Sequence, residues 1–284
     1  MLTPDAIKAV NEFVYKQPRA VKEISELLKV SWVTADKYLN YMIEKYGTIK
    51  IKTFRGGTRG ALKIVYWANL EGMRASTAQQ ILLDKIKTGK KKQDFNPFDI
   101  YSLVDHNKKD AFVMPNDKAD EQKLIDLIKN TSRQLFIFSG NISFINNTEN
   151  GKRLIDIIVE LARKRINIKI LCRVDIASIA NIKKILELNN LIGYDAVEVR
   201  HIEQPLRGFV IDDKIIRLRD EKKKSDYKDN EINKDVYLIY NIYDKEWVEW
   251  LEKVFWNLHS NALPIENRIN DLEKIEDLLI GNKI

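Results

Sequence analysis

Between residues 1 and 70 the spacing of apolar residues changes once, at Gly47, from a helical period to a strand period. Before that glycine, apolar residues recur three and four positions apart, as in the buried stripe of a helix. After it, apolar residues alternate with lysines, as in a strand with one buried face. The segment is therefore expected to fold as three helices followed by a β-hairpin. The predicted elements are helices over about 4–15 and 21–30, a third helix that begins after Ser31, and strands around 49–52 and 62–66.

Two residues mark where helices begin in this segment. Thr3 before Pro4 is typical of an N-cap residue followed by the first helical position, and Ser31 stands in the same place before the third helix. Two or three residues separate the second helix from the third, which is the link that a helix-turn-helix allows. Three helices followed by a basic hairpin resemble a winged helix-turn-helix domain. This resemblance implies an α+β winged helix domain over residues 1–70.

Positive charge is concentrated in the same segment. Residues 1–70 hold 12 Lys and Arg against 6 Asp and Glu, a net charge of +6, whereas residues 71–284 hold 36 against 35, a net charge of +1. A cationic face attracts phosphates and releases their counterions, so charge on one small module indicates a nucleic-acid partner. We therefore expect this segment to bind double-stranded DNA.

The resemblance also assigns residues to the DNA contact. In winged helix domains the third helix presents its N-terminal, outward residues to base edges in the major groove, while the hairpin reaches the adjacent groove or backbone. The residues so assigned in the third helix are Ser31, Trp32, Thr34, Lys37, Tyr38 and Tyr41. Those in the hairpin are Lys50, Lys52, Arg55, Arg59 and Lys63. The alternative for Trp32 and Tyr38 is packing in the core, and for the lysines it is ordinary solvation.

Length and composition set limits for the rest of the chain. At 284 residues, 44% of them apolar, the chain can bury a second core beside the small module, so two domains are expected. Cys172 is the single cysteine, which excludes a disulfide within the chain and, with only three histidines, argues against a zinc site. We expect no metal and no cofactor. Because no apolar run approaches the roughly 20 residues that span a bilayer, we expect a cytoplasmic, nucleoid-associated protein without membrane contact.

Residues 71–117 are predicted to form a linker. A helix is expected over about 73–87, and the segment 88–93, with three consecutive lysines, then breaks it. These lysines either contact the DNA backbone or remain solvated. The apolar residues that follow are too many for a free tether, so we expect them to dock on a domain. They are Phe95, Phe98, Tyr101, Leu103, Phe112 and Met114.

Helical and strand patterns alternate from about residue 118, which predicts an α/β domain with a mixed sheet over residues 118–262. The predicted strands are 135–139, 168–171, 197–199, 208–211, 215–218 and 236–240, and the predicted helices are 124–128, 154–162, 176–188 and 244–259. A charged amphipathic helix is expected over 263–284. Its apolar stripe either packs on its own domain or pairs two chains. The stripe consists of Ile265, Ile269, Leu272, Ile275 and Leu279.

The segment Pro205–Lys214 resembles the core of a phospholipase D-like domain. That family's catalytic motif is His-x-Lys, then four residues, then Asp; aligned on Asp212, the histidine position holds Pro205 and the lysine position holds Arg207. The mechanism that the resemblance implies passes through a phosphohistidine intermediate, and proline has no nucleophilic atom that could form it. Arginine at the lysine position can still bind an anion. We therefore expect a catalytically degenerate domain. Arg207, Asn141 and Asp212 are the candidates for binding an anion or effector.

His201, four residues before Pro205, is an alternative nucleophile, but that shift moves it about 13 Å along an extended strand. A winged helix followed by a phospholipase D-like domain without the histidine resembles TrmB-type archaeal transcriptional regulators. This resemblance implies a homodimeric regulator or architectural protein whose C-terminal domain dimerises or senses a small-molecule effector. The alternatives are a phosphodiesterase or nuclease that the winged helix targets to DNA, and a winged helix that makes protein contacts inside a transcription or replication assembly.

Overall fold

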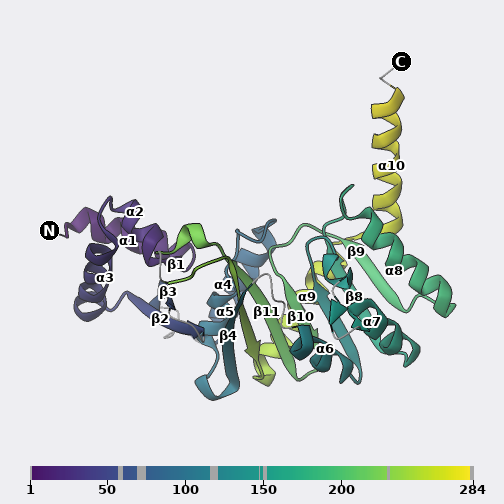
Figure 1. Cartoon of the computed structure of the whole chain (residues 1–284), viewed down its shortest axis with the longest axis horizontal. Coiled ribbons are helices and arrows are strands. Elements are labelled where there is room, and N and C mark those ends of the chain that lie inside the picture. The colour runs from purple at the N-terminus through teal and green to yellow at the C-terminus, as the bar shows by residue number, and fades with distance from the viewer. Residues whose placement is uncertain are drawn as a thin grey trace. The chain divides into compact units, whose positions relative to one another are not determined.

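Contacts within the chain separate two compact units in the computed structural model (Figure 1). The structure describes residues 2–56, 60–68, 75–115, 121–146, 148–149, 152–228 and 231–281. The first unit comprises Met1–Lys85, Phe95–Ala119 and Leu218–Ile242, and the second comprises Ile86–Asp94, Asp120–Arg217 and Tyr243–Ile284. Both units are thus assembled from separate stretches of chain, whereas the sequence predicts boundaries near residues 70, 117 and 262.

The first unit begins with the three helices and the hairpin that the sequence predicts. The helices are α1 (Pro4–Lys16), α2 (Val21–Leu27) and α3 (Trp32–Tyr46). The strands β1 (Arg19–Ala20), β2 (Ile49–Gly56) and β3 (Gly60–Trp67) form an antiparallel sheet in the order β1-β3-β2.

Local signals account for the ends of these helices. The Thr3 hydroxyl accepts the Ala6 N–H and the Ser31 hydroxyl accepts the Thr34 N–H, so both predicted N-caps are confirmed. Gly47, at a φ of 62°, ends α3 in the left-handed conformation that glycine adopts without strain. One apolar cluster then joins the helices to the hairpin. Its buried members are Val10, Val14, Val21, Ile24, Ala35, Leu39, Met42, Ile49 and Val65.

Later stretches of chain complete the first unit, including part of the predicted linker. After α4 (Ala75–Thr88), α5 (Phe98–Leu103) and a short turn lead into β4 (Lys109–Pro115). This strand pairs antiparallel with β12 (Val236–Ile242) along its whole length. Nearly every residue of β4 is half-buried, so the strand carries no polar–apolar alternation by which the sequence could predict it.

The second unit carries most of a mixed sheet of eight strands. The full order is β13-β9-β8-β5-β10-β11-β12-β4. The strands β5 (Gln134–Phe138), β8 (Asn167–Cys172) and β9 (Val197–His201) are parallel to one another, and β10 (Gly208–Ile211) runs antiparallel to β5. The other strands are β11 (Ile215–Lys222), the short β13 (Leu263–Pro264), and the separate pair β6 (Thr148–Glu149) and β7 (Lys152–Arg153). The predicted α/β class with a mixed sheet is therefore confirmed.

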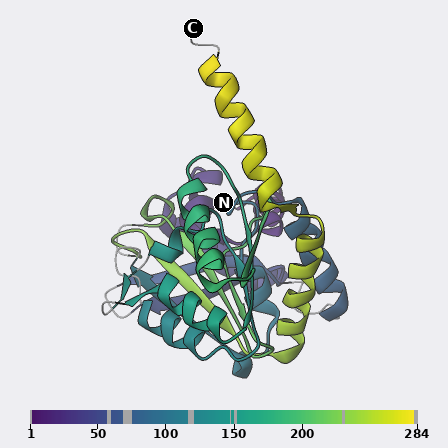
Figure 2. The same ribbon diagram turned by 90° about the vertical axis from the view of Figure 1, so that its right-hand side faces the viewer.

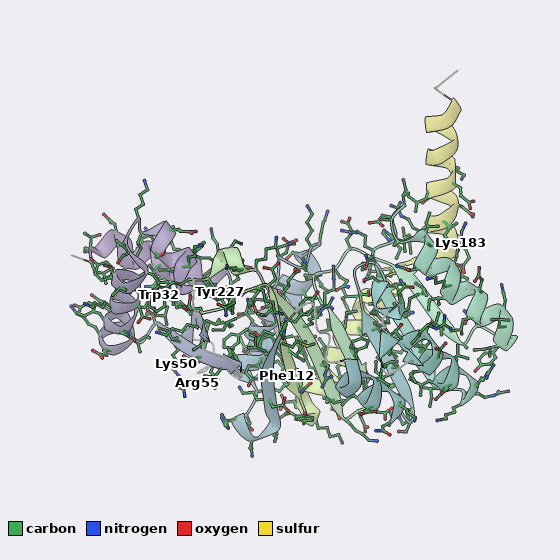
Figure 3. All side chains as sticks on the ribbon, viewed as in Figure 1. Trp32, Lys50, Arg55, Phe112, Lys183 and Tyr227 are labelled. Atoms are coloured by element: carbon green, nitrogen blue, oxygen red, sulfur yellow. The ribbon has the colours of Figure 1, made fainter. Side chains whose placement is uncertain are left out.

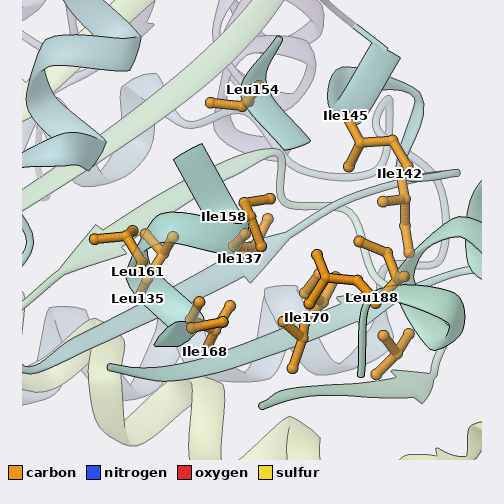
Figure 4. Packing of buried hydrophobic residues seen from close by; sticks show 14 of the residues in the cluster. Leu135, Ile137, Ile142, Ile145, Leu154, Ile158, Leu161, Ile168, Ile170 and Leu188 are labelled. Atoms are coloured by element: carbon orange, nitrogen blue, oxygen red, sulfur yellow. The ribbon is translucent and has the colours of Figure 1, made fainter. Parts of the chain in front are cut away.

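Helices cover this sheet because each carries an apolar stripe. In α7 (Leu154–Arg163), Leu154, Ile157, Ile158 and Leu161 are buried at spacings of three and four. They meet Ile137 and Ile170 from the sheet in the large core of the unit (Figure 4). The remaining helices are α6 (Glu121–Lys129), α8 (Ile179–Ile192), α9 (Lys245–Ser260) and α10 (Ile265–Gly281). The C-terminal end of α10 extends away from the rest of its unit (Figure 2).

Candidate functional sites

The solvent-facing stripe of α3 is the first candidate site. Val33, Lys37 and Tyr41 are exposed at successive spacings of four, opposite the side on which Ala35 and Leu39 are buried. This geometry confirms that Lys37 and Tyr41 point outward, as the sequence predicts. It also adds five exposed residues that sequence reasoning missed: Val33, Asn40, Glu44, Lys45 and Tyr46. For the first four of these, the signal was present in the sequence, because their positions lie outside the apolar stripe of the helix.

Tyr41 belongs to a small cationic and aromatic cluster at the C-terminal half of α3. The Lys45 amino group donates a hydrogen bond to the Tyr41 hydroxyl at 2.7 Å and lies 5.2 Å and 5.4 Å from the ring centres of Tyr41 and Tyr46. The hydrogen bond to Tyr41 is the main cause that raises the pKa of Lys45. Tyr41 and Tyr46 are 44% and 43% exposed, so the cluster offers both a fixed positive charge and stacking surface to a ligand.

Other predicted residues of α3 are engaged within the protein. The Ser31 and Thr34 hydroxyls lie 2.8 Å apart, and Ser31 caps the helix, so both are tied to the start of α3. Trp32 is half-buried against the apolar cluster of the helices. Its ring is flanked by the amino groups of Lys63 at 5.1 Å and Lys228 at 4.9 Å. The Trp32 side chain therefore packs against the core, which is the alternative that the sequence left open.

The hairpin differs from the expected basic wing, because buried residues lie on both of its faces. Phe54, 6% exposed, lies on the same face of β2 as Lys50 and Lys52. Its ring centre is 6.0–6.2 Å from those of three other aromatic residues: Phe98, Tyr101 and Tyr240. The cross-strand neighbours Leu62 and Ile64 are buried as well. The part of the lysine-bearing face around Phe54 therefore packs against α5 and β12.

The cationic residues of the hairpin occupy different environments as a result. Lys50 and Arg55 are exposed (Figure 3), whereas Lys52 and Lys63 are half-buried. Lys63 forms an ion pair with Asp36 at 2.8 Å, which offsets part of its charge. Arg59 lies outside the described residues. Of the hairpin cations assigned from the sequence, Lys50 and Arg55 are thus the two that the described structure places at the surface.

The second candidate site lies at the carboxyl ends of β5 and β8, where Arg207 approaches Gly140. The Arg207 guanidinium donates to the Leu206 carbonyl at 2.6 Å and to the Gln204 carbonyl at 3.0 Å. A Cβ atom at Gly140 would lie 3.0 Å from the Arg207 Nη2 atom, so a side chain here would make the guanidinium shift by a few tenths of an ångström. The half-buried Asn141 follows directly and accepts the Ser143 N–H. The structure therefore brings Arg207 and Asn141 to one place.

Asp212 is not part of that group, and its assignment to an anion or effector site is corrected. It follows the opposite end of β10, because Gly208 pairs with Phe138 whereas Ile211 pairs with Leu135. The carboxylate is 1% exposed and accepts the backbone N–H groups of Ser132, Arg133 and Gln134. Burial raises the pKa of Asp212, but these hydrogen bonds outweigh it and lower the pKa overall. Asp212 holds the beginning of β5.

The groups that could act as nucleophiles near Arg207 are poorly suited to that role. Pro205 is buried and has no nucleophilic atom. The Nδ1 atom of His201 accepts the Val174 N–H at 2.8 Å, and burial, with the charge of Arg268, lowers the pKa of this histidine. Burial also raises the pKa of the Cys172 thiol to about 12, so the thiolate is scarce at neutral pH.

Metal-binding clusters and membrane-spanning helices are both absent from the parts of the chain that the structure describes. There, no three or more His, Cys, Asp or Glu residues are grouped so that they could hold a metal ion. In the same parts of the chain, no helix has the length and apolar character that crossing a membrane requires.

Comparison with known proteins gives only distant similarities. No protein-family profile and no curated protein sequence matches the chain. The chain is similar to the solved structure of TrmBL2, described as an archaeal chromatin protein with a novel mode of DNA binding, with 15% identity, 92% of each chain covered and a TM-score of 0.42. It is similar to NucT from Helicobacter pylori with 16% identity over 56% of this chain and 99% of that one, at a TM-score of 0.41.

A third similarity is to Nuc from Salmonella typhimurium, described as a phospholipase D family member. The identity is 10%, the coverage 55% of this chain and 98% of that one, and the TM-score 0.39. The neighbours thus include a DNA-binding protein and a phospholipase D family member. Because all three TM-scores are below 0.5, these similarities carry no argument about the fold or function of this chain.

Proposed function

We propose that the chain is a DNA-binding protein whose residues 1–70 act as a winged helix-turn-helix module. The observation that carries this proposal is the exposed stripe of α3, which presents Lys37, Tyr41 and Lys45 to solvent in a segment of net charge +6. A helix that offers cationic and aromatic side chains along one face is suited to enter the major groove. The exposed Arg55 and Lys50 of the hairpin would add contacts to the phosphate backbone.

The second unit serves this function without catalysis. Pro205 stands where a phospholipase D-like enzyme has its nucleophilic histidine, and the hydrogen bond to Val174 occupies one nitrogen of His201. Arg207 and Asn141 instead form a site for an anionic small-molecule effector. Addition of inorganic phosphate should raise the Tm of the wild-type chain more than that of Arg207→Gln. An equal shift in both proteins would exclude Arg207 from the site.

The chain acts as a homodimeric transcriptional regulator, since one small module makes too few contacts for a specific site. The first part of the α10 stripe packs on its own unit, where Ile265 and Leu272 are buried and Ile269 lies against the same core. The side chains of Ile275 and Leu279 lie outside the described ones. Sedimentation equilibrium of the full chain tests the dimer, and a monomer at tens of micromolar would exclude it.

DNA binding is tested by fluorescence anisotropy with a labelled duplex and the full chain over a series of salt concentrations. We expect binding that weakens steeply as salt rises, because phosphate contacts release counterions. Lys37→Ala and Tyr41→Ala should weaken binding to a selected site, whereas Lys183→Ala, on an exposed part of α8, serves as the control. An absence of binding at low salt would refute the proposed function.

The competing function is that of a phosphodiesterase or nuclease targeted to DNA. Incubation of duplex DNA, single-stranded DNA and a chromogenic phosphodiester, with and without added divalent metal, distinguishes the two. We expect retarded migration of the duplex without cleavage. Cleavage by the wild-type chain that persists in a Cys172→Ser variant and disappears in His201→Ala would instead identify an enzyme and return His201 to the role of nucleophile.

A further inference from the structure

The loop between β11 and β12 is anchored beside the helices of the first unit. This β11–β12 loop covers residues 223–235, of which 229 and 230 lie outside the described part. Tyr227 and Ile232 are 4% and 7% exposed and fix the loop to the unit. The Lys22 amino group of α2 also donates a hydrogen bond to the Ser225 carbonyl. The loop is thus held against α2, which lies far earlier in the sequence.

The loop reaches the beginning of α3 as well. Lys228 places its amino group 4.9 Å from the ring centre of Trp32, which is the first residue of that helix. Trp32 and Tyr227, the residue before Lys228, are labelled in Figure 3. Because the N-terminus of a helix carries a partial positive charge, Lys228 adds to a positive potential that already exists there. An anionic ligand would be attracted to this position.

The described acids of the loop accept hydrogen bonds from other residues of the loop. The Asp235 carboxylate accepts the Lys224 N–H at 2.8 Å, and the Glu231 carboxylate accepts the Lys228 N–H at 2.9 Å. The third described acid, Asp226, accepts the Ser225 hydroxyl. The acids are therefore used in hydrogen bonds inside the loop. The side chains of Lys223, Lys224 and Lys228 are exposed, in contrast to Lys222 just before the loop, which is buried in an ion pair with Asp220.

We propose that Lys223, Lys224 and Lys228 form a second phosphate-contacting site, beside α2 and the start of α3, that binds the DNA backbone next to the bases that α3 contacts. This inference rests on the proposed function and extends it to a segment outside residues 1–70. Three exposed ammonium groups on an anchored loop can each pair with a phosphate and carry no base specificity. The loop therefore strengthens binding to every sequence alike.

The test compares the full wild-type chain with Lys223→Ala/Lys224→Ala/Lys228→Ala in titrations of labelled duplex over a range of salt concentrations. We expect the slope of log K against log salt to fall by up to roughly 2.7 units, because each phosphate contact contributes about 0.9 to that slope. The order of preference among duplex sequences should stay the same. A control variant, Lys164→Ala/Lys183→Ala/Lys253→Ala, removes three exposed lysines from the second unit and should keep the wild-type slope.

Replacement of the three loop lysines by arginine should preserve the slope, because the positive charges remain. An unchanged slope in the alanine variant would overturn the proposal, and so would tighter binding, which would mean that the loop blocks the duplex. Equal reductions of the slope in the loop and control variants would also overturn it. A wild-type chain that binds no DNA would refute the proposed function itself, which distinguishes that failure from a failure of the loop alone.

Discussion

The substitution Asp212→Asn tests whether this carboxylate holds β5 in place. Asp212 is buried, and its two oxygens accept five hydrogen bonds from Ser132, Arg133 and Gln134 at 2.8–3.2 Å. Its φ of 51° lies in the left-handed region, which asparagine tolerates as well as aspartate. The substitution therefore removes charge and one acceptor without adding backbone strain.

The expected loss of stability follows from these hydrogen bonds. An asparagine oxygen in the place of Oδ1 can still accept the N–H groups of Arg133 and Gln134 and the longer, 3.2 Å bond from the Ser132 N–H. The amide nitrogen would replace Oδ2, so the Ser132 N–H loses its shorter bond and the Ser132 hydroxyl loses its acceptor. A hydrogen bond to a charged group contributes about 1.5–3 kcal/mol, and the bonds that remain become neutral and weaker. We therefore expect the free energy of unfolding to fall by about 2–4 kcal/mol.

Urea denaturation monitored by near-UV circular dichroism measures this loss. The matched control is Asp213→Asn, because the Asp213 side chain is 41% exposed and its ion pair with Arg133 is long, at 3.7 Å. The control should change stability by no more than about 0.5 kcal/mol. A loss below about 1 kcal/mol for Asp212→Asn, or an equal loss in the control, would contradict a structural role for this carboxylate.

The pH dependence provides an independent check. The folded-state pKa of Asp212 is lowered relative to the unfolded chain, so its contribution to stability is fully present above the unfolded value of about 3.9. That contribution is lost as the pH falls through the lower, folded value. Wild type should therefore lose stability more steeply than Asp212→Asn below about pH 4. If the free energy of unfolding fell equally steeply in the two proteins below about pH 4, the result would contradict the hydrogen-bond argument.

Three further predictions concern the first unit. Lys37→Ala and Tyr41→Ala should change which sequences are preferred, by about 1–3 kcal/mol for each direct interaction with a base, as selection from a randomised operator library would measure. Uniform weakening across the library would assign both residues to the backbone instead. Arg55→Ala with Arg59→Ala should lower the salt slope of duplex binding by up to roughly 2 units, and an unchanged slope would remove the hairpin tip from the interface. Phe54→Ala should cost about 3–5 kcal/mol in urea denaturation, because its ring is packed among three aromatic residues. A much smaller cost would mean that the hairpin does not depend on that packing.

Signals that act over a few residues were sufficient to predict most helices and strands. The apolar residues of α7 recur at three and four because successive turns of one helix stack above each other, and Ser31 caps α3 through an N–H three residues away. The continuous apolar run 135–138 likewise predicts a buried strand, and β5 is buried along its length. The outward direction of Lys37 and Tyr41 followed from the same periodicity.

Only the tertiary structure decided what covers these elements. Lys50 and Lys52 alternate with isoleucines and so predict a solvent-facing side, yet Phe54 on that side packs against Tyr240, which lies near the other end of the sequence. Asp212 fits a catalytic motif by spacing, but its partners begin at Ser132, 80 residues earlier. Lys228 reaches Trp32 across a still longer stretch of chain. The spacing of apolar residues indicates which side of a helix or strand is buried. It does not indicate which distant segment covers that side, because contacts between distant segments depend on the path of the whole chain.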